Sequence, residues 1–340
     1  MINKTGVYII AEAGVNHNGN VGIAKKMIDA ASECGVDAIK FQTYKTENIV
    51  TKYADKAKYQ KLNTKSNDSQ YEMLKKLELS FDDFAELSNY CKEKKLEFLS
   101  TPFDFESADF LNDMGIKVFK ISSGDITNIP FLQYVAKKNK PMIISTGMSN
   151  LGEIEEAIRA IKDMGNSSIY ILHCTSNYPA KLETVNLNAI DTLKAAFKLP
   201  VGYSDHTEGI EIPIAAAAKG ACIIEKHFTL NKNSEGPDHK ASLDVEELNA
   251  MVRAIRNVEK AMGDGIKKCT ADEEDVKTAA RKSIVASRFI KKGEIIRKED
   301  ISFKRPGSGI SPKDYNYIIN KRAKRDIEED EQIHFLMIEE

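Results

Sequence analysis

The chain has 340 residues, and its 49 lysines and arginines nearly balance 51 aspartates and glutamates, for a formal net charge of −2. The lack of a basic excess argues against nucleic acid as a partner, and no apolar run is long enough to span a bilayer. The five cysteines are scattered, and residues 1–5 lead into strand-like sequence without a signal-peptide core. We therefore expect reduced thiols in a cytoplasmic enzyme that contacts neither nucleic acid nor membrane.

A single unit recurs along the chain from Val7 onward: a short apolar run, a polar end and an amphipathic helical pattern. Eight such units over about 260 residues predict a (β/α)8 TIM barrel, with a doubly wound open sheet as the alternative. We favour the barrel because every strand has polar residues at its carboxyl end, where barrels carry their active sites. The strands are expected at residues 7–13, 38–43, 98–103, 118–125, 142–148, 169–175, 201–206 and 223–229.

Two segments depart from this unit. Residues 44–69 form a polar, lysine-rich insertion, which we interpret either as a lid or binding loop or as a mobile surface excursion. The barrel domain is expected over residues 1–265, followed by a charged and weakly periodic linker over 266–281. Residues 282–340 predict a compact, turn-rich module, which is small for a stable core, so we expect it to dock on a barrel.

The last two predicted strands each carry a histidine near the carboxyl end. Because side chains alternate along a strand, Ser204 and His206 share one face, as do Glu225, His227 and Thr229. Two imidazoles with oxygen ligands suit a divalent ion such as Mn or Fe, although a polar edge strand with solvated side chains would show the same pattern. The spacing is not a zinc signature, because the chain has no HExxH and no paired CxxC.

The polar residues at the strand ends converge on one mouth if the sheet closes into a barrel. A lysine in a buried strand is costly unless it meets an anion, and ammonium and hydroxyl donors together suit a phosphate beside a carboxylate. The simpler interpretations are solvated lysines and hydroxyls that only cap the following helices. The residues alone predict a metal-assisted enzyme acting on a small phosphorylated or carboxylated metabolite, with Glu12 or Glu225 moving protons. The set comprises Glu12, Lys40, Gln42, Thr101, Lys120, Ser123, Ser145, Tyr178, Ser204, His206, Glu225 and His227.

Ordered motifs along essentially the whole chain resemble the bacterial sialic acid (N-acetylneuraminate) synthases, with their legionaminic and pseudaminic acid relatives. The Lys304–Gly307 run is similar to the C-terminal antifreeze-like (SAF) domain of that family. The barrel motifs are IAEAGVNHNG at 10–19, KFQ at 40–42, STPF at 100–103, STGM at 145–148, YSDHT at 203–207, EKHFT at 225–229 and GPDH at 236–239.

The resemblance implies condensation of phosphoenolpyruvate with N-acetylmannosamine and water, giving N-acetylneuraminate and phosphate. It implies that His206 and His227 hold a divalent metal, Mn with Mg or Co as alternatives, which activates the sugar aldehyde. Arg305 would reach the N-acyl group from a partner subunit, which implies a domain-swapped homodimer. The implied catalytic residues are Glu12, Lys40, Lys120 and Glu225, the phosphoenolpyruvate contacts are Lys40, Thr101, Lys120, Ser123, Ser145 and Ser204, and the sugar contacts are Gln42, Tyr178 and Asp238.

Two positions depart from the family pattern, and both fall near the expected sugar pocket. Asp125 stands where many members carry Glu, and Ser176 stands where several carry Asn or Thr. The alternative within the family is a legionaminic acid synthase acting on 2,4-diacetamido-2,4,6-trideoxymannose, and a sugar-phosphate acceptor is a further one. The alternative of another class is a non-catalytic protein that binds a sugar or phosphoenolpyruvate.

Overall fold

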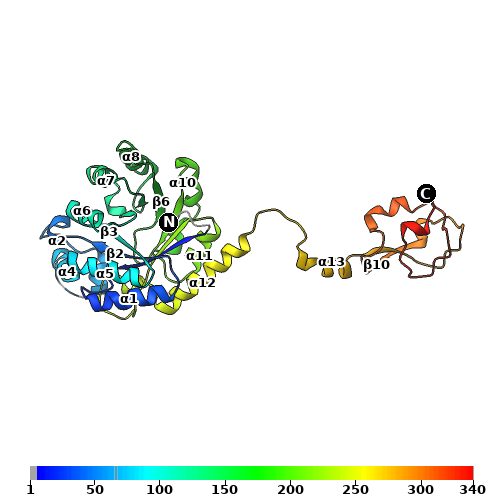
Figure 1. Ribbon diagram of the computed structural model, residues 1–340, viewed down its shortest axis with the longest axis horizontal. Coiled ribbons are helices and arrows are strands. Elements are labelled where there is room, and N and C mark those ends of the chain that lie inside the picture. Colours follow the sequence, from blue (N-terminus) through cyan, green and yellow to red (C-terminus); the bar gives the residue numbers. More distant parts are fainter. Residues whose placement is uncertain (1–5, 65, 67, 340) are drawn as a thin grey trace. The chain divides into compact units, whose positions relative to one another are not determined.

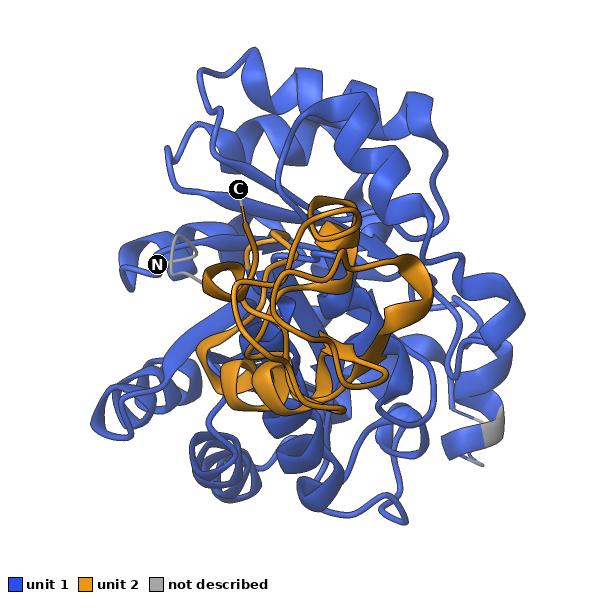
Figure 2. Cartoon of the chain, turned by 90° about the vertical axis from the view of Figure 1, so that its right-hand side faces the viewer, with its two compact units in different colours: residues 1–263 blue, residues 264–340 orange. Residues whose placement is uncertain are grey.

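The computed structural model describes residues 6–64, 66 and 68–339. The described residues fall into two compact units, one within residues 1–263 and one within 264–340 (Figure 2). Part of the segment expected to be a linker is helical, because η3 (Ala271–Glu273) and α13 (Glu274–Ala280) lie in it. These two elements belong to the second unit.

Among the described residues of the first unit, eight parallel strands form one sheet in the order β3-β2-β1-β8-β7-β6-β5-β4. The first and last strands of the chain pair with each other, and β3 and β4 are also in contact, so the sheet closes on itself. This confirms the predicted (β/α)8 barrel. The strands are β1 (Tyr8–Gly14), β2 (Ala38–Thr43), β3 (Glu97–Pro102), β4 (Phe119–Ile121), β5 (Met142–Ser145), β6 (Ile169–Cys174), β7 (Val201–Asp205) and β8 (Ile223–His227).

Helices surround the strands (Figure 1). Polar residues immediately before several helices fix where those helices begin. Ser80, Asn150 and Asp244 each form a capping box, which satisfies backbone N–H groups that a helix start leaves free. The helices of this unit are α1 (Val21–Glu33), α2 (Thr46–Ile49), α3 (Lys58–Thr64), α4 (Gln70–Leu77), α5 (Phe81–Glu93), α6 (Phe105–Asp113), α7 (Ile129–Ala136), α8 (Leu151–Lys162), α9 (Leu182–Val185), α10 (Ala189–Phe197), α11 (Glu211–Ala218) and α12 (Val245–Met262), with short 3-10 turns η1 (Ser123–Asp125) and η2 (His239–Ala241).

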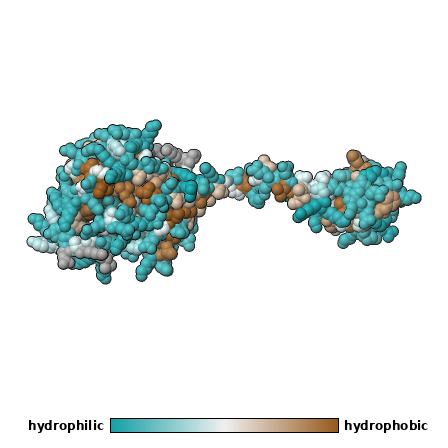
Figure 3. Space-filling view, turned by 90° about the horizontal axis from the view of Figure 1, so that it is seen from below, coloured by the Kyte–Doolittle hydropathy of each residue, from teal (hydrophilic) through white to brown (hydrophobic). Residues whose placement is uncertain are grey.

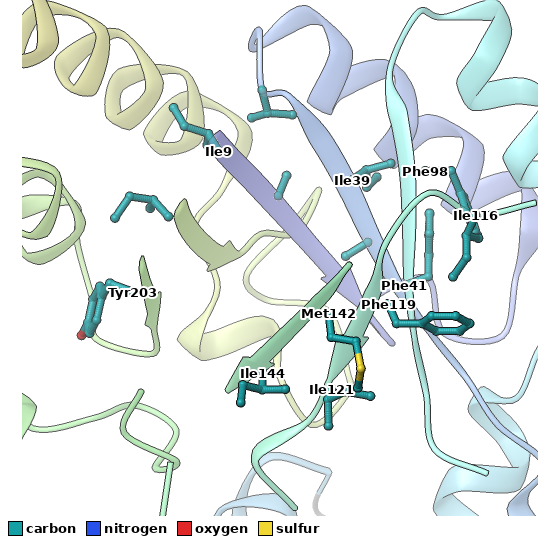
Figure 4. Packing of buried hydrophobic residues seen from close by; sticks show 14 of the residues in the cluster. Ile9, Ile39, Phe41, Phe98, Ile116, Phe119, Ile121, Met142, Ile144 and Tyr203 are labelled. Atoms are coloured by element: carbon teal, nitrogen blue, oxygen red, sulfur yellow. The ribbon is translucent and has the colours of Figure 1, made fainter. Parts of the chain in front are cut away.

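The core of the barrel has two layers because strand side chains alternate between faces. Outward-facing residues such as Ile9, Ile39 and Phe119 pack between the strands and the helices (Figure 4). Inward-facing residues fill the barrel below the carboxyl ends of the strands, namely Tyr8, Ile10, Ala38, Leu99, Val118, Ile143, Leu172 and Ile223. Two positions after Ile10, Ala38 and Ile223 come Glu12, Lys40 and Glu225, so the apolar layer carries a polar layer on the same inner face.

The second unit has a small hydrophobic core of its own and few regular elements. Two antiparallel strands, β9 (Ser283–Ala286) and β10 (Ile301–Lys304), pair beside the short turns η4 (Lys298–Asp300), η5 (Pro312–Tyr317) and η6 (Phe335–Met337). Its core is mostly isoleucine: Ile284, Ile290, Ile296, Ile310, Ile318, Ile327, Ile333 and Ile338. The unit thus has the turn-rich character that its sequence indicates.

No helix within the described part of the chain is both long and apolar enough to cross a membrane. The face of the chain seen in Figure 3 is mostly hydrophilic, with smaller hydrophobic areas between polar residues.

Candidate active site

A cavity of about 490 Å³ opens at the carboxyl ends of the barrel strands. All twelve residues of the converging set line it, from Glu12 on β1 to His227 on β8. The other lining residues were not singled out individually from the sequence, although Ala57, Tyr59 and Gln60 lie in the insertion interpreted as a possible binding loop. They are Ala57, Tyr59, Gln60, Gln70, Phe103, Ser122, Gly124, Met148 and Cys174. Ser176, noted as a departure from the family pattern, lines it too. Tyr59 and Gln60 come from α3, so part of the insertion forms a wall of this cavity.

Two buried lysines face two buried carboxylates at the floor of the cavity. Lys40 Nζ lies 2.6 Å from Glu12 Oε2 and 3.7 Å from Glu225 Oε2. Lys120 Nζ lies 3.6 Å from Glu225 Oε1. All four side chains are at most 6% exposed, and burying charges at this depth is costly unless they pair with one another or with a ligand.

Hydroxyl groups surround this charge cluster. Lys120 Nζ donates to Ser145 Oγ at 2.7 Å, and Ser204 Oγ donates to Glu225 Oε1 at 2.9 Å. Lys40 Nζ donates to Thr101 Oγ1 at 3.3 Å. The ammonium groups and the hydroxyl hydrogens can be redirected to a ligand, because hydroxyl groups rotate to suit their partners.

The two carboxyl groups have different proton affinities. Burial raises the pKa of Glu12 to about 7, against the opposing charge of Lys40. Burial would raise the pKa of Glu225 too, but Lys120 and Lys40 outweigh it and hold that pKa below its ordinary value. Glu12 can therefore exchange a proton near neutral pH while Glu225 stays charged, an arrangement typical of acid–base sites.

Several acceptor atoms of the cavity are buried and lack a hydrogen bond. Glu12 Oε2 and Glu225 Oε2 have no hydrogen-bond partner within the described residues, although both lie near Lys40. Glu12 Oε2 is nevertheless paired with the Lys40 ammonium group at 2.6 Å, whereas Glu225 Oε2 lies 3.7 Å from it. Buried polar atoms of folded proteins are nearly always paired, so Glu225 Oε2 keeps capacity for a ligand, a water or a proton.

The two predicted metal ligands lie side by side at the mouth, with ring centroids 5.4 Å apart. His206 Nδ1 lies 2.8 Å from the Thr175 carbonyl oxygen, to which it donates. Burial lowers the pKa of His206, but Cys174 and this hydrogen bond outweigh it and raise that pKa above its ordinary value, and Nε2 offers a lone pair when the ring is neutral. His227 Nδ1 is buried without a partner in the described part of the chain. Burial, with the nearby His206, holds the pKa of His227 well below its usual value, so this imidazole is neutral.

Imidazole nitrogens are common ligands of divalent cations, and His227 is neutral and unpaired at Nδ1 among the described residues. Within the described residues there is no group of three or more His, Cys, Asp and Glu side chains placed to hold a metal ion. A cation bound by His206 and His227 would therefore take its other ligands from substrate or water.

An aromatic ring covers both histidines. The Tyr178 ring lies 4.1 Å from the His206 ring and 5.7 Å, nearly perpendicular, from the His227 ring, centroid to centroid. Cys174 Sγ lies 3.7 Å from His206 Nδ1 on the other side. Cys174 follows Leu172 on the inner face of β6, so the alternation of that strand could have predicted its position.

Four residues that the sequence analysis singled out do not line this cavity. Asp238 is buried in the loop after β8, and burial raises its pKa to about 6 against the charge of His206. Asp125 lines a neighbouring cavity of about 460 Å³ that shares Gln42 with the first one. Arg305 is exposed in the second unit. Thr229, expected beside His227, instead hydrogen-bonds to His239 Nδ1 at 2.7 Å, because β8 ends at His227.

Known proteins match the chain over nearly its whole length. The NeuB family model matches residues 27–267, and the SAF domain model matches residues 281–339. The N,N'-diacetyllegionaminic acid synthase of Campylobacter jejuni is 52% identical, covering 96% of this chain and 98% of that protein. The protein of the same name from Legionella pneumophila is 49% identical, covering 94% of this chain and 91% of that protein.

Solved structures agree with these matches. The crystal structure of the N-acetylneuraminic acid synthetase from Leptospira borgpetersenii aligns with a TM-score of 0.70 at 35% identity, covering 80% of this chain and 90% of that one. The site described above thus lies in a fold shared with synthases of sugar acids. The chain belongs to the NeuB family, is an enzyme of the synthase type and carries a SAF domain over residues 281–339.

Proposed function

We propose that the chain condenses phosphoenolpyruvate with an N-acylated mannosamine-type sugar and water, giving a nine-carbon 2-keto acid and phosphate. The observation that carries this proposal is the buried cluster of Lys40, Lys120, Glu12 and Glu225 on the floor of a hydroxyl-lined cavity. Such a cluster offers cations for a dianionic phosphate and a carboxylate, and it offers carboxyl groups for proton transfer.

Phosphoenolpyruvate is assigned to the floor of the cavity. Lys40 and Lys120 neutralise its phosphate and carboxylate, and the hydroxyl groups of Thr101, Ser123, Ser145 and Ser204 donate to its oxygens. Ser123 Oγ already accepts from the Gly147 N–H at 2.9 Å, which fixes that hydroxyl at the cavity wall. The fit is electrostatic, so it favours an anionic ligand over a neutral one of the same size.

The reaction forms one carbon–carbon bond and exchanges the bond from C2 to the phosphate oxygen for a bond from C2 to a water oxygen. C3 of phosphoenolpyruvate bonds to the aldehyde carbon of the open-chain sugar, and the aldehyde oxygen takes up a proton. Water then adds at C2 and gives up both protons as it becomes the keto oxygen, while the bond from C2 to the phosphate oxygen breaks and phosphate leaves with the electron pair and one proton. Glu12 is suited to move these protons because its pKa is about 7, whereas Glu225 stays charged and steadies the two lysines.

His206 and His227 are assigned to a divalent metal, Mn with Mg or Co as alternatives. When bound, the metal supplies Lewis-acid polarisation of the sugar aldehyde. The support for this assignment is the pair of neighbouring imidazoles and the unpartnered His227 Nδ1.

The acceptor sugar is assigned to the outer part of the cavity. Gln42 and Tyr178 line it, and Asp238 is buried near His206. We assign Arg305 to the N-acyl group, delivered from a partner subunit, so the working form is a domain-swapped homodimer. We place this activity in the cytoplasm, where phosphoenolpyruvate is available.

N-acetylmannosamine is the proposed acceptor, which makes the product N-acetylneuraminate. A second candidate, 2,4-diacetamido-2,4,6-trideoxymannose, is favoured by the names of the relatives at 52% and 49% identity. We would measure phosphate release from phosphoenolpyruvate with Mn²⁺ and each sugar in turn. Higher kcat/KM with the first sugar supports the N-acetylneuraminate product, and higher kcat/KM with the second supports the legionaminic product. If no phosphate is released with either sugar, the proposed reaction is contradicted and a non-catalytic binding protein is favoured.

A further inference from the structure

The insertion between β2 and α5 contributes an aromatic side chain to the cavity that the reaction proposed above does not use. Tyr59, near the start of α3, lines the cavity beside Gln60. Its ring stacks on Tyr178, with the centroids 5.1 Å apart and the planes 28° apart. Tyr178 also stacks on His206, so Tyr59 contacts the ring that covers the proposed metal ligands.

Two sets of hydrogen bonds hold Tyr59 in place. Lys56, three residues earlier, is buried, and its Nζ donates to Thr64 Oγ1 at 3.0 Å and to the Ser66 carbonyl oxygen at 2.8 Å. These bonds close the segment around α3 into a compact turn. Asn63 Nδ2 donates to the Pro237 carbonyl oxygen at 2.7 Å. The segment is therefore tied to the loop that carries Asp238, the residue after Pro237.

The chemistry around Tyr59 points to the sugar and not to phosphoenolpyruvate. The lysines and Ser145, assigned to phosphoenolpyruvate, lie on the floor of the cavity, and none of the contacts of Tyr59 described here involves them. Burial and the charge of Asp238 raise the pKa of Tyr59. The hydrogen bond from Asn63 to the Pro237 carbonyl oxygen joins the helix of Tyr59 to the loop of Asp238, a proposed sugar contact. Aromatic faces pack well against the C–H groups of a sugar chain and the methyl of an acyl group.

We infer that Tyr59 is a positioning residue for the acceptor sugar, which holds the Tyr178 ring in place and so forms one wall of the acceptor site. This inference rests on the proposed function. An unsupported Tyr178 ring would have room to rotate away from His206, and the acceptor would lose a preformed surface. Phosphoenolpyruvate, on the floor of the cavity, would bind as before.

The test is steady-state kinetics of Tyr59→Ala, with both substrates varied. Losing an aromatic pair of this kind is expected to raise the KM for the acceptor sugar about tenfold, with the KM for phosphoenolpyruvate within about twofold of wild type. Tyr59→Phe keeps the ring and is expected to rescue most of the acceptor affinity. Tyr59→Leu keeps the bulk without the ring and serves in place of Tyr59→Ala if that variant does not fold. Equal changes in both KM values, or no change in either, would overturn the inference.

A double variant separates positioning from general loss of structure. If Tyr59 acts through Tyr178, then Tyr59→Ala adds little to Tyr178→Ala, so the acceptor KM of the double variant matches that of Tyr178→Ala within about twofold. Multiplying effects would show that Tyr59 acts independently of Tyr178 and would overturn the proposed route. Tyr53→Ala is the matched control, because Tyr53 lies in the same insertion and is 94% exposed. Wild-type protein that releases no phosphate would overturn the proposed function itself, whatever the Tyr59 variants do.

Discussion

Two buried groups of charges lie at the carboxyl ends of β7 and β8, on opposite faces of the barrel wall. On the outer face, Lys226 Nζ donates to Asp205 Oδ2 and to the Thr207 carbonyl oxygen. Asp205 also accepts from the Tyr203 hydroxyl at 2.8 Å and from the Thr207 N–H at 3.1 Å. On the inner face, Glu225 faces Lys40 and Lys120 at 3.7 and 3.6 Å.

The two groups are alike in burial and in chemistry but differ in how fully they are paired. Both Asp205 oxygens accept hydrogen bonds, whereas Glu225 Oε2 accepts none among the described residues. The outer pair therefore holds two strands together, and the inner cluster keeps capacity for a ligand. Lys226 and Glu225 are neighbours in the sequence, and the two-residue period of the strand sends them to opposite faces. Charges are buried on both faces, but only the inner face carries a carboxylate oxygen, Glu225 Oε2, without a hydrogen bond from the described residues.

Breaking the outer pair should have the largest effect. Lys226→Met leaves Asp205 buried and charged without its cation, and we expect a loss of about 3–5 kcal/mol in the free energy of unfolding. Urea unfolding followed by circular dichroism measures this loss. The double variant Lys226→Met with Asp205→Asn removes both charges and should recover most of it. A single-variant loss below about 1 kcal/mol would show that the outer pair does not stabilise the barrel.

A substitution in the inner cluster should reduce activity more than it reduces stability. Lys40→Met removes a cation from the proposed phosphoenolpyruvate site, and we expect kcat/KM for phosphoenolpyruvate to fall at least about 100-fold. Its loss of unfolding free energy should be smaller than that of Lys226→Met, because Glu12 can take up a proton and become neutral. Kinetics and urea unfolding on the same preparation test both parts. Lys52→Met changes an exposed lysine and is the control. Kinetics within threefold of wild type would remove Lys40 from the site.

The sequence predicted the inner cluster because two regular patterns determine it. Strand alternation puts Glu12, Lys40 and Glu225 above an apolar layer, and a closed parallel sheet brings their strand ends together. Neither inference needs the details of packing. The sequence does not indicate the Lys226–Asp205 pair. Each of these residues lies between site residues on its strand and points to the opposite face, and alternation alone does not say which residue it meets there.

Tyr59 could not be predicted, because its place depends on a fold without a periodic signal. The insertion reaches the cavity through hydrogen bonds such as those of Lys56 and Asn63, which join positions that no sequence pattern relates. The expected placement of Thr229 on the same face as His227 has a related limit. Side-chain alternation applies only as far as the strand continues, and β8 ends two residues before Thr229. Arg305 lies in the second unit, so its proposed role stays a prediction.

The pH dependence of stability tests the inner cluster through the proton that Glu12 binds. The pKa of Glu12 is about 7 in the folded protein and 4.5 for an ordinary glutamate. The folded state therefore binds this proton more tightly, and the stabilisation is complete below pH 4.5 and lost as the pH rises to about 7. Glu12→Gln removes this dependence. The difference in unfolding free energy between variant and wild type should shift in favour of the variant across that range, by at most roughly 1.4 kcal/mol per pH unit.

Urea unfolding between pH 4 and pH 8 measures the shift, with Asp238→Asn as the matched comparison. Asp238 has a pKa of about 6 against an ordinary value of 3.8, so its variant should show its shift at lower pH and level off near pH 6. A shift for Glu12→Gln confined to the same lower range would show that Lys40 offsets more of the effect of burial, so that the pKa of Glu12 is no higher than about 6. Glu12 would then be charged throughout the neutral range like Glu225, and the inner cluster would have to take its exchangeable proton from another group.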